Sequence, residues 1–255
     1  MSNNDSTYLF TVVTVTWNAA RVLPPTLESV KAQRYTDFEY LVVDGASTDH
    51  TLQLVRDADI AGTRIVSEPD RGLYDAMNKA IGLARGEYIV WLNAGDSFAD
   101  DQALTRLAHA AEREPNADVL YGQTLLVDSH RRVIGPRHLT APTPLCAASF
   151  KQGMVVCHQA FVARRDIMPQ YDMSYRYSAD YDWCIKILKR SRANAYCGDA
   201  PLIHFLSDEG TTVSHRRASL VERYRIMCRH YGALAATLHH LSFIPRYLRR
   251  KLKGR

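Results

Sequence analysis

Residues 67–97, SEPDRGLYDAMNKAIGLARGEYIVWLNAGDS, contain the signals that decide the fold. An apolar segment at 88–92 runs directly into the polar turn at 93–96, which is typical of a buried strand that ends at the edge of a sheet. In an open α/β sheet this carboxyl end of the strands is where ligands bind. The acid of the turn, Asp96, is therefore placed to hold a divalent cation against a phosphate oxygen. In a plain surface turn it would instead cap a helix that starts near residue 100.

On both sides of this stretch, strand and helix patterns alternate over the first hundred residues. Runs of β-branched and aromatic residues predict near-continuous buried strands, as a parallel sheet requires, at 8–16, 38–43, 64–67 and 88–92. Helices are expected between them, the first beginning at Pro24, the others at 51–57 and at 73–84. This alternation predicts βαβ units and an α/β fold with a doubly wound, mostly parallel sheet.

After residue 100 the alternation is less regular. The pattern predicts helices at 101–113 and 181–188, and strands at 119–127, 132–134, 158–163, 193–197 and 202–206. A hairpin turn is expected at 128–131, a proline-rich loop at 135–144 and a polar loop at 207–214.

The composition divides the chain into an acidic body and a basic end. With 255 residues, 46% of them apolar, the chain is long enough for one large domain or one domain with an appendage. Residues 214–255 carry eleven Arg and Lys against one acid, Glu222, for a charge of +10. Because the whole chain is +5, residues 1–213 carry −5. We therefore expect two functional parts.

Several classes of protein are disfavoured by what the sequence lacks. No apolar run approaches the roughly 18 residues of a spanning helix, and the N-terminal residues lack the basic start of a secretory signal. The five cysteines are scattered and without CxxC spacing, which favours reduced thiols in a cytosolic protein over disulfides or a zinc site. Neither GxGxxG after the first strand nor GxxxxGK(S/T) is present, so neither a dinucleotide fold nor a P-loop is supported.

Polar side chains at the predicted strand ends offer another way to bind a nucleotide. Those that close the first, second and fourth strands are Thr14, Thr16, Asn18, Asp44 and Asp96. A strand-end carboxylate can accept hydrogen bonds from a base or a ribose hydroxyl, although an Asp-Gly pair by itself is typical of a simple turn. Arg71 and the helix that begins at Gly72 favour the charge of a pyrophosphate.

Five separated motifs resemble, in this order, those of family 2 glycosyltransferases: VVDGASTDHT from residue 42, SEPDRGLYDAMNKAI from 67, GEYIVWLNAGDSF from 86, CHQAFV from 157 and YDMSYRYSADYDW from 171. The resemblance covers about residues 8–214 and is strongest to the bacterial subgroup of colanic-acid and other exopolysaccharide biosynthesis. It implies a GT-A fold in a domain at 1–213, with a nucleotide-sugar half at 1–96 and an acceptor half at 97–213.

Position by position, the resemblance also implies roles for single residues. Thr16 and Asp44 match nucleoside contacts, Arg71 and Gly72 lie in the segment that approaches the diphosphate, and Asp96 matches the last acid of a metal-binding DxD element. Asn93 and Gly95 stand where acids often occur, so Asp96 is the one charged ligand of the turn. One carboxylate with phosphate oxygens and waters is enough for Mg²⁺ or Mn²⁺, and we expect such a cofactor.

Direct displacement at a sugar carbon requires a carboxylate that takes the proton of the acceptor hydroxyl. Asp180 and Asp182 lie at the start of the helix expected at 181–188, and because they are two positions apart only one can face the sugar. The acidic motif of the family matches Asp180 as the base, and Asp182 is then a candidate helix cap. Alternatively, both acids only favour the helix dipole.

Two histidines and one loop each have alternative roles. His158 is either a contact to the donor or acceptor sugar or a hydrogen-bonded core residue. His204 is either a second metal ligand or a buried structural residue. The loop at 207–214 resembles one that closes on the donor, although Asp208 and Glu209 replace small residues.

The basic end is expected to be helical at 214–231 and again, as a basic amphipathic segment, at 234–252. Such a segment binds anionic membrane surfaces, so removal of the residues after Ile244 is expected to abolish vesicle binding. A solvated helix end or nucleic-acid affinity is the alternative, but no nucleic-acid-binding module is recognisable.

Together these features predict a glycosyltransferase that moves a sugar from a nucleoside diphosphate to a hydroxyl of a lipid-linked saccharide, in exopolysaccharide or lipopolysaccharide assembly. The family resemblance implies that it is an inverting enzyme. It would be cytoplasmic and peripheral at the inner face of the cell membrane. One alternative is a nucleotidyltransferase, which needs a glycine- and lysine-rich loop where this chain has WNAARVLPP at 17–25. The other is a non-catalytic sugar-nucleotide-binding or scaffold protein, which would not hydrolyse the donor.

Overall fold

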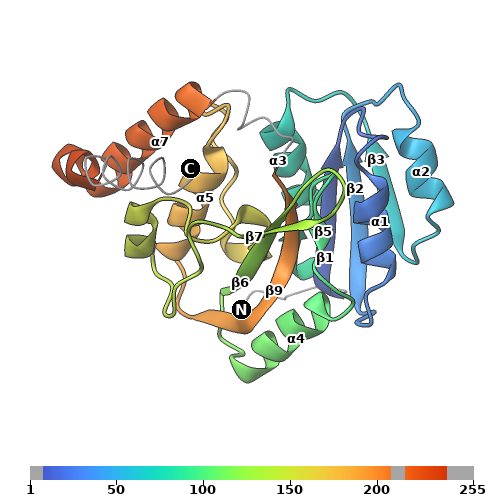
Figure 1. The fold of residues 1–255 in the computed structure, drawn as a ribbon, viewed down its shortest axis with the longest axis horizontal. Coiled ribbons are helices and arrows are strands. Elements are labelled where there is room, and N and C mark those ends of the chain that lie inside the picture. Colours follow the sequence, from blue (N-terminus) through green and yellow to red (C-terminus); the bar gives the residue numbers. More distant parts are fainter. Residues whose placement is uncertain (1–7, 208–215, 240–255) are drawn as a thin grey trace.

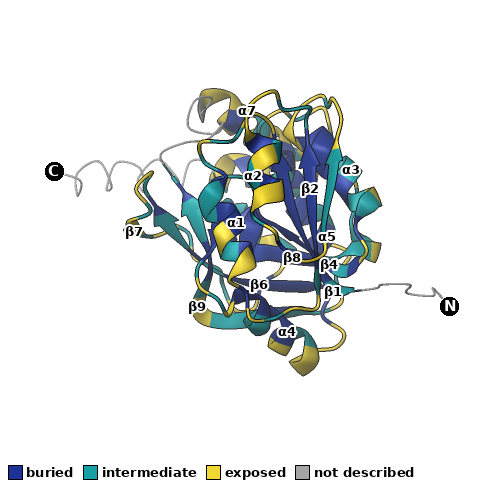
Figure 2. Ribbon diagram, turned by 90° about the vertical axis from the view of Figure 1, so that its right-hand side faces the viewer, coloured by how far each residue is buried: buried dark blue, intermediate teal, exposed yellow. Residues whose placement is uncertain are grey.

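The structure, a computed structural model, describes residues 8–207 and 216–239 of the chain. Within these residues, nine strands form one sheet with the order β3-β2-β1-β4-β8-β6-β9-β5, and β7 pairs with β6 (Figure 1). The central strands are buried, and exposed residues lie on the outward sides of the helices (Figure 2).

The first half of the sheet confirms the doubly wound, parallel pattern. Its elements are β1 (Tyr8–Thr16), α1 (Pro24–Lys31), β2 (Phe38–Asp44), α2 (Thr51–Asp57), β3 (Thr63–Ser67), α3 (Leu73–Leu83) and β4 (Gly86–Trp91). The chain first moves outward from β1 to β3 and then returns to the other side of β1 with β4. Because such crossovers are right-handed, α1 and α2 cover one face and α3 the opposite face (Figure 1). The switch point between β1 and β4 is where such sheets bind ligands.

The second half extends the sheet mainly with antiparallel pairs. Its elements are β5 (Ser97–Phe98), α4 (Ala103–Arg113), β6 (Val119–Val127), β7 (Val133–Pro136), the 3-10 helices η1 (Ala147–Gln152), η2 (His158–Ala160) and η3 (Arg165–Ile167), β8 (Phe161–Arg164), α5 (Ala179–Leu188), β9 (Asn194–Leu206) and α7 (Arg216–Tyr231). Strand β8 joins the halves because it pairs antiparallel with both β4 and β6.

Two predicted elements differ from those observed. The strand expected at 158–163 begins as the 3-10 turn η2, closed by a hydrogen bond from the Ala160 N–H to the Cys157 carbonyl. The strands expected at 193–197 and 202–206 are one strand, β9, whose register on β6 shifts between residues 196 and 201. The segment Gly198-Asp-Ala-Pro201 has the composition of a turn, and the register shift falls within it, so it forms an irregularity between two parts of β9 that both pair with β6.

A cluster of aromatic side chains fixes α5 against the end of β4. Trp183 of α5 stacks on Tyr171 with ring centroids 4.9 Å apart and meets Trp91 of β4 edge to face at 6.3 Å. The three rings are buried, so they position the start of α5 through a large area of apolar contact.

Helix α7 is tied to the segment that leads into α5. The carboxylate of Glu222 accepts hydrogen bonds from the backbone N–H groups of Arg176 and Tyr177, both at 2.8 Å, and the Ser219 and Ser178 hydroxyls lie 2.9 Å apart. The separation into parts at 1–213 and 214–255 stays a prediction. The loop at 208–215 and the basic segment after residue 239, with its predicted membrane contact, lie outside the described residues. No helix within the described ranges is long and apolar enough to cross a membrane.

Candidate functional site at the carboxyl edge of the sheet

Two buried oxygen atoms at the ends of β1 and β4 have no hydrogen-bond partner among the described residues: Thr16 Oγ1 and Asn93 Oδ1. These strands are parallel neighbours at the switch point of the sheet. A buried polar atom left unpaired costs about 1–3 kcal/mol, and in native proteins such atoms usually meet a ligand or an ordered water. Both atoms therefore make this edge a candidate ligand site.

Asp44, at the end of β2, organises the loop beside that site. Its buried carboxylate accepts hydrogen bonds from the Ser47 N–H at 2.9 Å, from the Ser47 hydroxyl and from the Ser67 hydroxyl at 2.7 Å. The sequence singled out Asp44 as a nucleoside contact; the structure buries it at the carboxyl edge of the sheet, where it joins the ends of β2 and β3. Any contact with a nucleoside depends on the remaining lone pairs of these two oxygens.

Asn18 holds the same loop from the side of β1. Its side-chain oxygen accepts a hydrogen bond from the Thr48 N–H at 2.8 Å, and its own N–H donates to the Ser47 hydroxyl at 2.8 Å. Asn18 has a positive φ of 48°, a conformation that Asn tolerates better than most residues. Its side-chain oxygen thus shapes the loop, and its amide nitrogen is the group that remains for a ligand.

Trp17, directly after β1, is a functional candidate that was not identified from the sequence. Its indole is 68% exposed, although it lies between buried strand ends. A Cβ atom placed on Gly45 would lie 3.4 Å from Trp17 Cδ1 and 2.6 Å from Asp70 Oδ2. Trp17 and Asp70 therefore approach the same backbone, which only glycine allows, and the exposed ring is suited to stack on a base. The sequence signal that could have identified Trp17 is its position as an aromatic residue directly after a buried strand.

Arg71 and Gly72 lie where the sequence placed them, at the start of α3. The Arg71 side chain is 78% exposed and pairs with Asp75 at 2.8 Å. The Gly72 N–H donates to Asp70 Oδ1 at 2.8 Å, and its φ of 115° is a conformation that favours glycine. Because an exposed ion pair of this kind is weak, Arg71 can exchange Asp75 for an anionic ligand.

Asp180, the predicted base, is the second residue of α5 and lies against α3. Its Oδ1 accepts hydrogen bonds from the Tyr74 hydroxyl at 3.2 Å and from the Tyr181 N–H at 2.9 Å. Both donors reach the same oxygen, so Oδ2 remains for a substrate. Ser67 binds Asp44, and Tyr74 binds Asp180. The segment at 67–97 therefore contacts both the predicted nucleoside-binding acid and the predicted base. Tyr74 was not identified from the sequence, because a contact across 106 residues leaves no local pattern.

Asp182 has a structural role, and its candidacy as a helix cap is wrong. The N-cap of α5 is Ser178, whereas Asp182 is fully buried one turn later. Its carboxylate pairs with Lys186 at 2.5 Å and with His230 of α7 at 2.6 Å. Asp180 and Asp182 thus point to different surroundings, as their spacing predicted.

His158 lies within the aromatic cluster. Its Nε2 is 2.7 Å from the Tyr171 hydroxyl, and its ring stacks on Trp91 at 5.8 Å. Burial lowers the pKa of His158 to about 4, although the Asp180 charge acts in the opposite direction, so the ring is neutral near pH 7. These contacts match the core alternative for His158, and its assignment as a substrate contact stays a prediction.

Asp96 is 5% exposed, and each of its oxygens is engaged. The Leu206 N–H donates to Oδ1 at 2.9 Å, and the Gln159 amide donates to Oδ2 at 2.6 Å. Burial raises the pKa of Asp96 to about 7, although these two hydrogen bonds and the charge of Arg131 act in the opposite direction. The carboxylate is therefore directed into the protein interior.

In this arrangement the carboxylate of this turn is not available to a metal ion. Asn93 and Gly95 contribute no carboxylate, and Asp96 is buried in other contacts. His204, considered as a second ligand, pairs within the sheet opposite Ser97. No group of three or more His, Cys, Asp or Glu side chains within residues 8–207 and 216–239 is arranged to hold a metal.

The burial of Asp96 predicts an unusual dependence of stability on pH. The folded chain holds this proton up to a pH of about 7, whereas the unfolded chain releases it near pH 3.9. Its contribution to the free energy of unfolding is thus fully present below about pH 4 and is lost as the pH rises through about 7. Urea unfolding of the wild type and of Asp96→Asn, which cannot titrate, should show a wild-type advantage that grows as the pH falls. A difference independent of pH would contradict the buried carboxylate.

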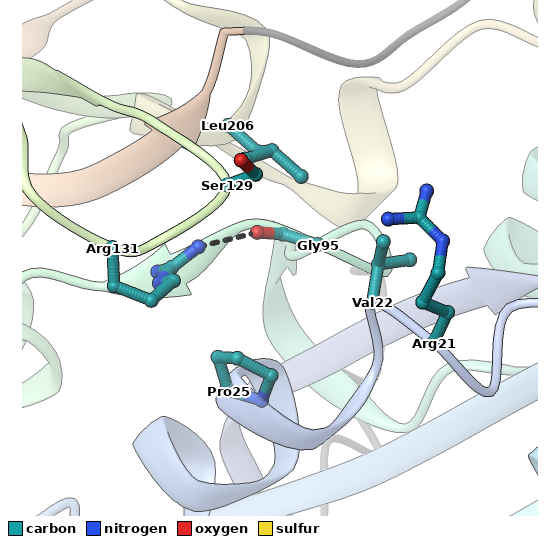
Figure 3. A pocket seen from close by; sticks show the side chains of 7 residues that line it. All are labelled: Arg21, Val22, Pro25, Gly95, Ser129, Arg131 and Leu206. Atoms are coloured by element: carbon teal, nitrogen blue, oxygen red, sulfur yellow. Dashed lines mark hydrogen bonds between the residues drawn. The ribbon is translucent and has the colours of Figure 1, made fainter.

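A small, open pocket lies directly beside this turn (Figure 3). Its lining residues are Arg21, Val22, Pro25, Gly95, Ser129, Arg131 and Leu206. They come from the loop between β1 and α1, the start of α1, the turn after β4, the hairpin between β6 and β7 and the end of β9. The pocket therefore opens at the same edge as Thr16 and Asn93, with two guanidinium groups in its wall.

Comparison with known proteins gives a family match over most of this region. The model of the family described as glycosyl transferase family 2 matches residues 11–171. The chain is also 35% identical, over 185 residues, to a PGL/p-HBAD biosynthesis glycosyltransferase of Mycobacterium bovis (strain BCG / Pasteur 1173P2). That alignment covers 70% of this chain and 69% of the relative.

Solved structures share the fold. A TarS fragment (residues 1–349) from S. aureus, in complex with UDP-GlcNAc, superposes with a TM-score of 0.68 at 20% identity, covering 86% of this chain and 64% of that one. The mannosyltransferase PcManGT from Pyrobaculum calidifontis, in complex with GDP-Man and Mn²⁺, has a TM-score of 0.65 at 19% identity, covering 92% of this chain and 70% of that one. At these identities the likeness establishes the GT-A fold expected from the sequence.

Proposed function

Because the chain belongs to glycosyltransferase family 2, we propose that it transfers a sugar, with inversion, from a nucleoside diphosphate donor to a hydroxyl group. The observation that carries the donor site is the pair of unpartnered buried oxygens, Thr16 Oγ1 and Asn93 Oδ1, at the switch point of the sheet. A hydroxyl and an amide oxygen are the groups that bind ribose and base edges.

The nucleoside is proposed to lie between Trp17 and the loop that Asp44 and Asn18 hold. The exposed indole supplies a stacking surface, and base–aromatic stacking contributes about 1–3 kcal/mol. Arg71, exposed at the start of α3, is a cation available to the anionic part of the same donor.

Asp180 is proposed to act as the base. Its Oδ1 is held by Tyr74 and Tyr181, so Oδ2 takes the proton when the O–H bond of the acceptor breaks. The acceptor oxygen then bonds to the anomeric carbon, and the bond from that carbon to the diphosphate breaks, with its electron pair leaving on the diphosphate. Attack opposite the leaving group inverts the configuration. Tyr74 and Tyr181 keep the carboxylate oriented for this step.

The acceptor, the cellular location and the cofactor are further parts of this proposal. A lipid-linked saccharide in cell-surface polysaccharide assembly is favoured by the sequence motifs, and the matched mycobacterial relative is named for PGL/p-HBAD biosynthesis. Action at the inner face of the membrane rests on the basic residues after position 214. Mg²⁺ or Mn²⁺ is implied by the family resemblance, and PcManGT was solved with Mn²⁺, but the turn at 93–96 offers no ligand set for such an ion.

A thermal-shift panel of UDP-, GDP- and dTDP-sugars tests the proposal. One donor is expected to raise the Tm of the full-length chain, since binding to the folded state stabilises it. Thr16→Val removes the unpartnered hydroxyl and should lower the shift, whereas Thr63→Val, at the amino end of β3, should retain it. If no nucleotide sugar raises the Tm, or if Thr16→Val responds like the wild type, the donor site is wrong.

A further inference from the structure

The side chain of Trp91, the last residue of β4, has one polar group, the indole N–H. Its Nε1 is buried and has no hydrogen-bond partner in the part of the chain that the structure describes. A buried Trp N–H usually has a partner, because an unpaired one loses its hydrogen bonds to water without replacement. In native proteins such a group meets a ligand or an ordered water. Trp91 therefore offers one hydrogen bond to a molecule other than the chain itself.

The polar groups of the rings around Trp91 are paired within the protein. The Trp183 N–H donates to the Pro169 carbonyl at 2.8 Å. The Tyr171 hydroxyl lies 2.7 Å from His158 Nε2. The His158 ring stacks on Trp91 at 5.8 Å, and the rings of Trp183 and Tyr171 meet the same indole edge to face. The unpaired N–H of Trp91 thus differs from the other polar groups of its own cluster.

Trp91 and Asn93 lie on the same face of the strand. The Leu92 N–H still donates to the Val13 carbonyl at 2.8 Å, so the chain keeps its pairing with β1 up to that residue. Side chains two positions apart along a strand point to the same face. The N–H of Trp91 and the side-chain oxygen of Asn93, both buried and unpartnered among the described residues, therefore lie on one face at the carboxyl edge of the sheet.

Trp91 also connects this face with the proposed base. Its ring meets Tyr171 edge to face at 5.8 Å, and Tyr171 in turn stacks on Tyr74 at 5.5 Å. The Tyr74 hydroxyl donates to Asp180. A donor with its nucleoside at Asn93 and its anomeric carbon facing Asp180 places its sugar between these two residues. Trp91, linked to both of them, is therefore placed to meet that sugar.

We propose that the Trp91 N–H donates a hydrogen bond to a hydroxyl oxygen of the transferred sugar, and that it thereby selects the donor by its sugar. This inference rests on the proposed function. The indole N–H is a donor only, and a sugar hydroxyl can accept its hydrogen bond. A sugar without that hydroxyl would leave the N–H buried and unpaired, so such a donor binds more weakly. Trp91 is thus a specificity-determining residue, whereas Thr16 and Asn93 are proposed to bind the nucleoside.

Isothermal titration calorimetry of the full-length chain in MnCl₂ tests the inference with pairs of probes: UDP-glucose and UDP, GDP-mannose and GDP, dTDP-glucose and dTDP. For the pair that binds, Trp91→Phe should weaken binding of the nucleotide sugar by about 10-fold, as expected when a buried hydrogen bond is lost. It should leave the Kd of the free diphosphate unchanged. Trp183→Phe is the matched control, because it makes the same change in the same cluster at an N–H that is paired with Pro169. It should change both affinities by the same factor.

The outcomes separate this inference from the proposed function. If Trp91→Phe changes the affinities for the nucleotide sugar and the free diphosphate by the same factor, or changes neither, the N–H meets only water. The inference is then overturned, and the glycosyltransferase proposal stands. If Trp91→Phe does not fold, Trp91 is replaced by benzothienylalanine, in which sulfur takes the place of the N–H in a ring of the same shape, and the same difference is expected. If no probe binds the wild type, the donor class and this inference are both wrong.

Discussion

Asp180→Asn is expected to reduce sugar transfer by about 10²- to 10⁴-fold, the usual contribution of a positioned general base, while leaving donor affinity unchanged. The amide can still accept hydrogen bonds at Oδ1 from the Tyr74 hydroxyl and the Tyr181 N–H, so the start of α5 should keep its position. It cannot take the proton of the acceptor. Turnover with the donor found by thermal shift, together with its Kd by calorimetry, measures the two effects separately.

The control for this variant is Asp172→Asn. Asp172 is an acid of the same motif, but it binds Ser174 and Arg229 rather than α3. Its variant should transfer sugar at close to the wild-type rate. Wild-type turnover in Asp180→Asn would refute the assignment of the base. Loss of donor binding in that variant would instead show that Asp180 holds the donor.

Asp182→Ala is expected to destabilise the fold by about 3–5 kcal/mol, because removing one partner of a buried ion pair leaves the other charges uncompensated. Asp182 is buried with Lys186 and His230, and the pair with His230 joins α5 to α7. Burial by itself would raise the pKa of Asp182, but hydrogen bonds from His230 and Lys186, with their charges, lower it overall. This stabilisation is present above the unfolded pKa of about 3.9 and is lost as the pH falls further.

Urea unfolding near pH 7 measures this loss. Asp101→Ala is the matched control, since Asp101 forms an exposed ion pair with Arg34 at 2.7 Å. A surface pair of that kind contributes at most about 1 kcal/mol. Equal effects of the two substitutions would show that the contact between α5 and α7 through Asp182 does not stabilise the fold.

The parallel half of the sheet could be predicted because its signals are local. Buried parallel strands are continuous apolar runs, and α3 shows apolar residues at helical spacing between Ser67 and Gly86. The rule that ligands bind at strand ends then led to Thr16, Asp44 and Asp96 without knowledge of their contacts. The structure places these residues at the same edge of the sheet, on β1, on β2 and after β4.

What the sequence could not predict depends on contacts between distant residues. The orientation of Asp96 is set by Gln159 and Leu206, which are 63 and 110 positions away. Those two hydrogen bonds decide that its carboxylate faces the interior, whereas the local motif predicted a metal ligand. The continuity of β9 is a similar case, because β6 pairs with β9 on both sides of a segment whose composition predicted a break.

The central claim is spatial: the donor lies at the switch point between β1 and β4, with its anomeric carbon facing Asp180. A crystal structure of the chain with the donor found in the thermal-shift panel, in the Asp180→Asn variant to prevent turnover, tests this directly. The account predicts the base against Trp17, a hydrogen bond to the Thr16 hydroxyl, and the anomeric carbon on the side of residue 180. A donor bound away from Thr16 and Asn93, or one whose anomeric carbon is turned away from residue 180, would contradict it.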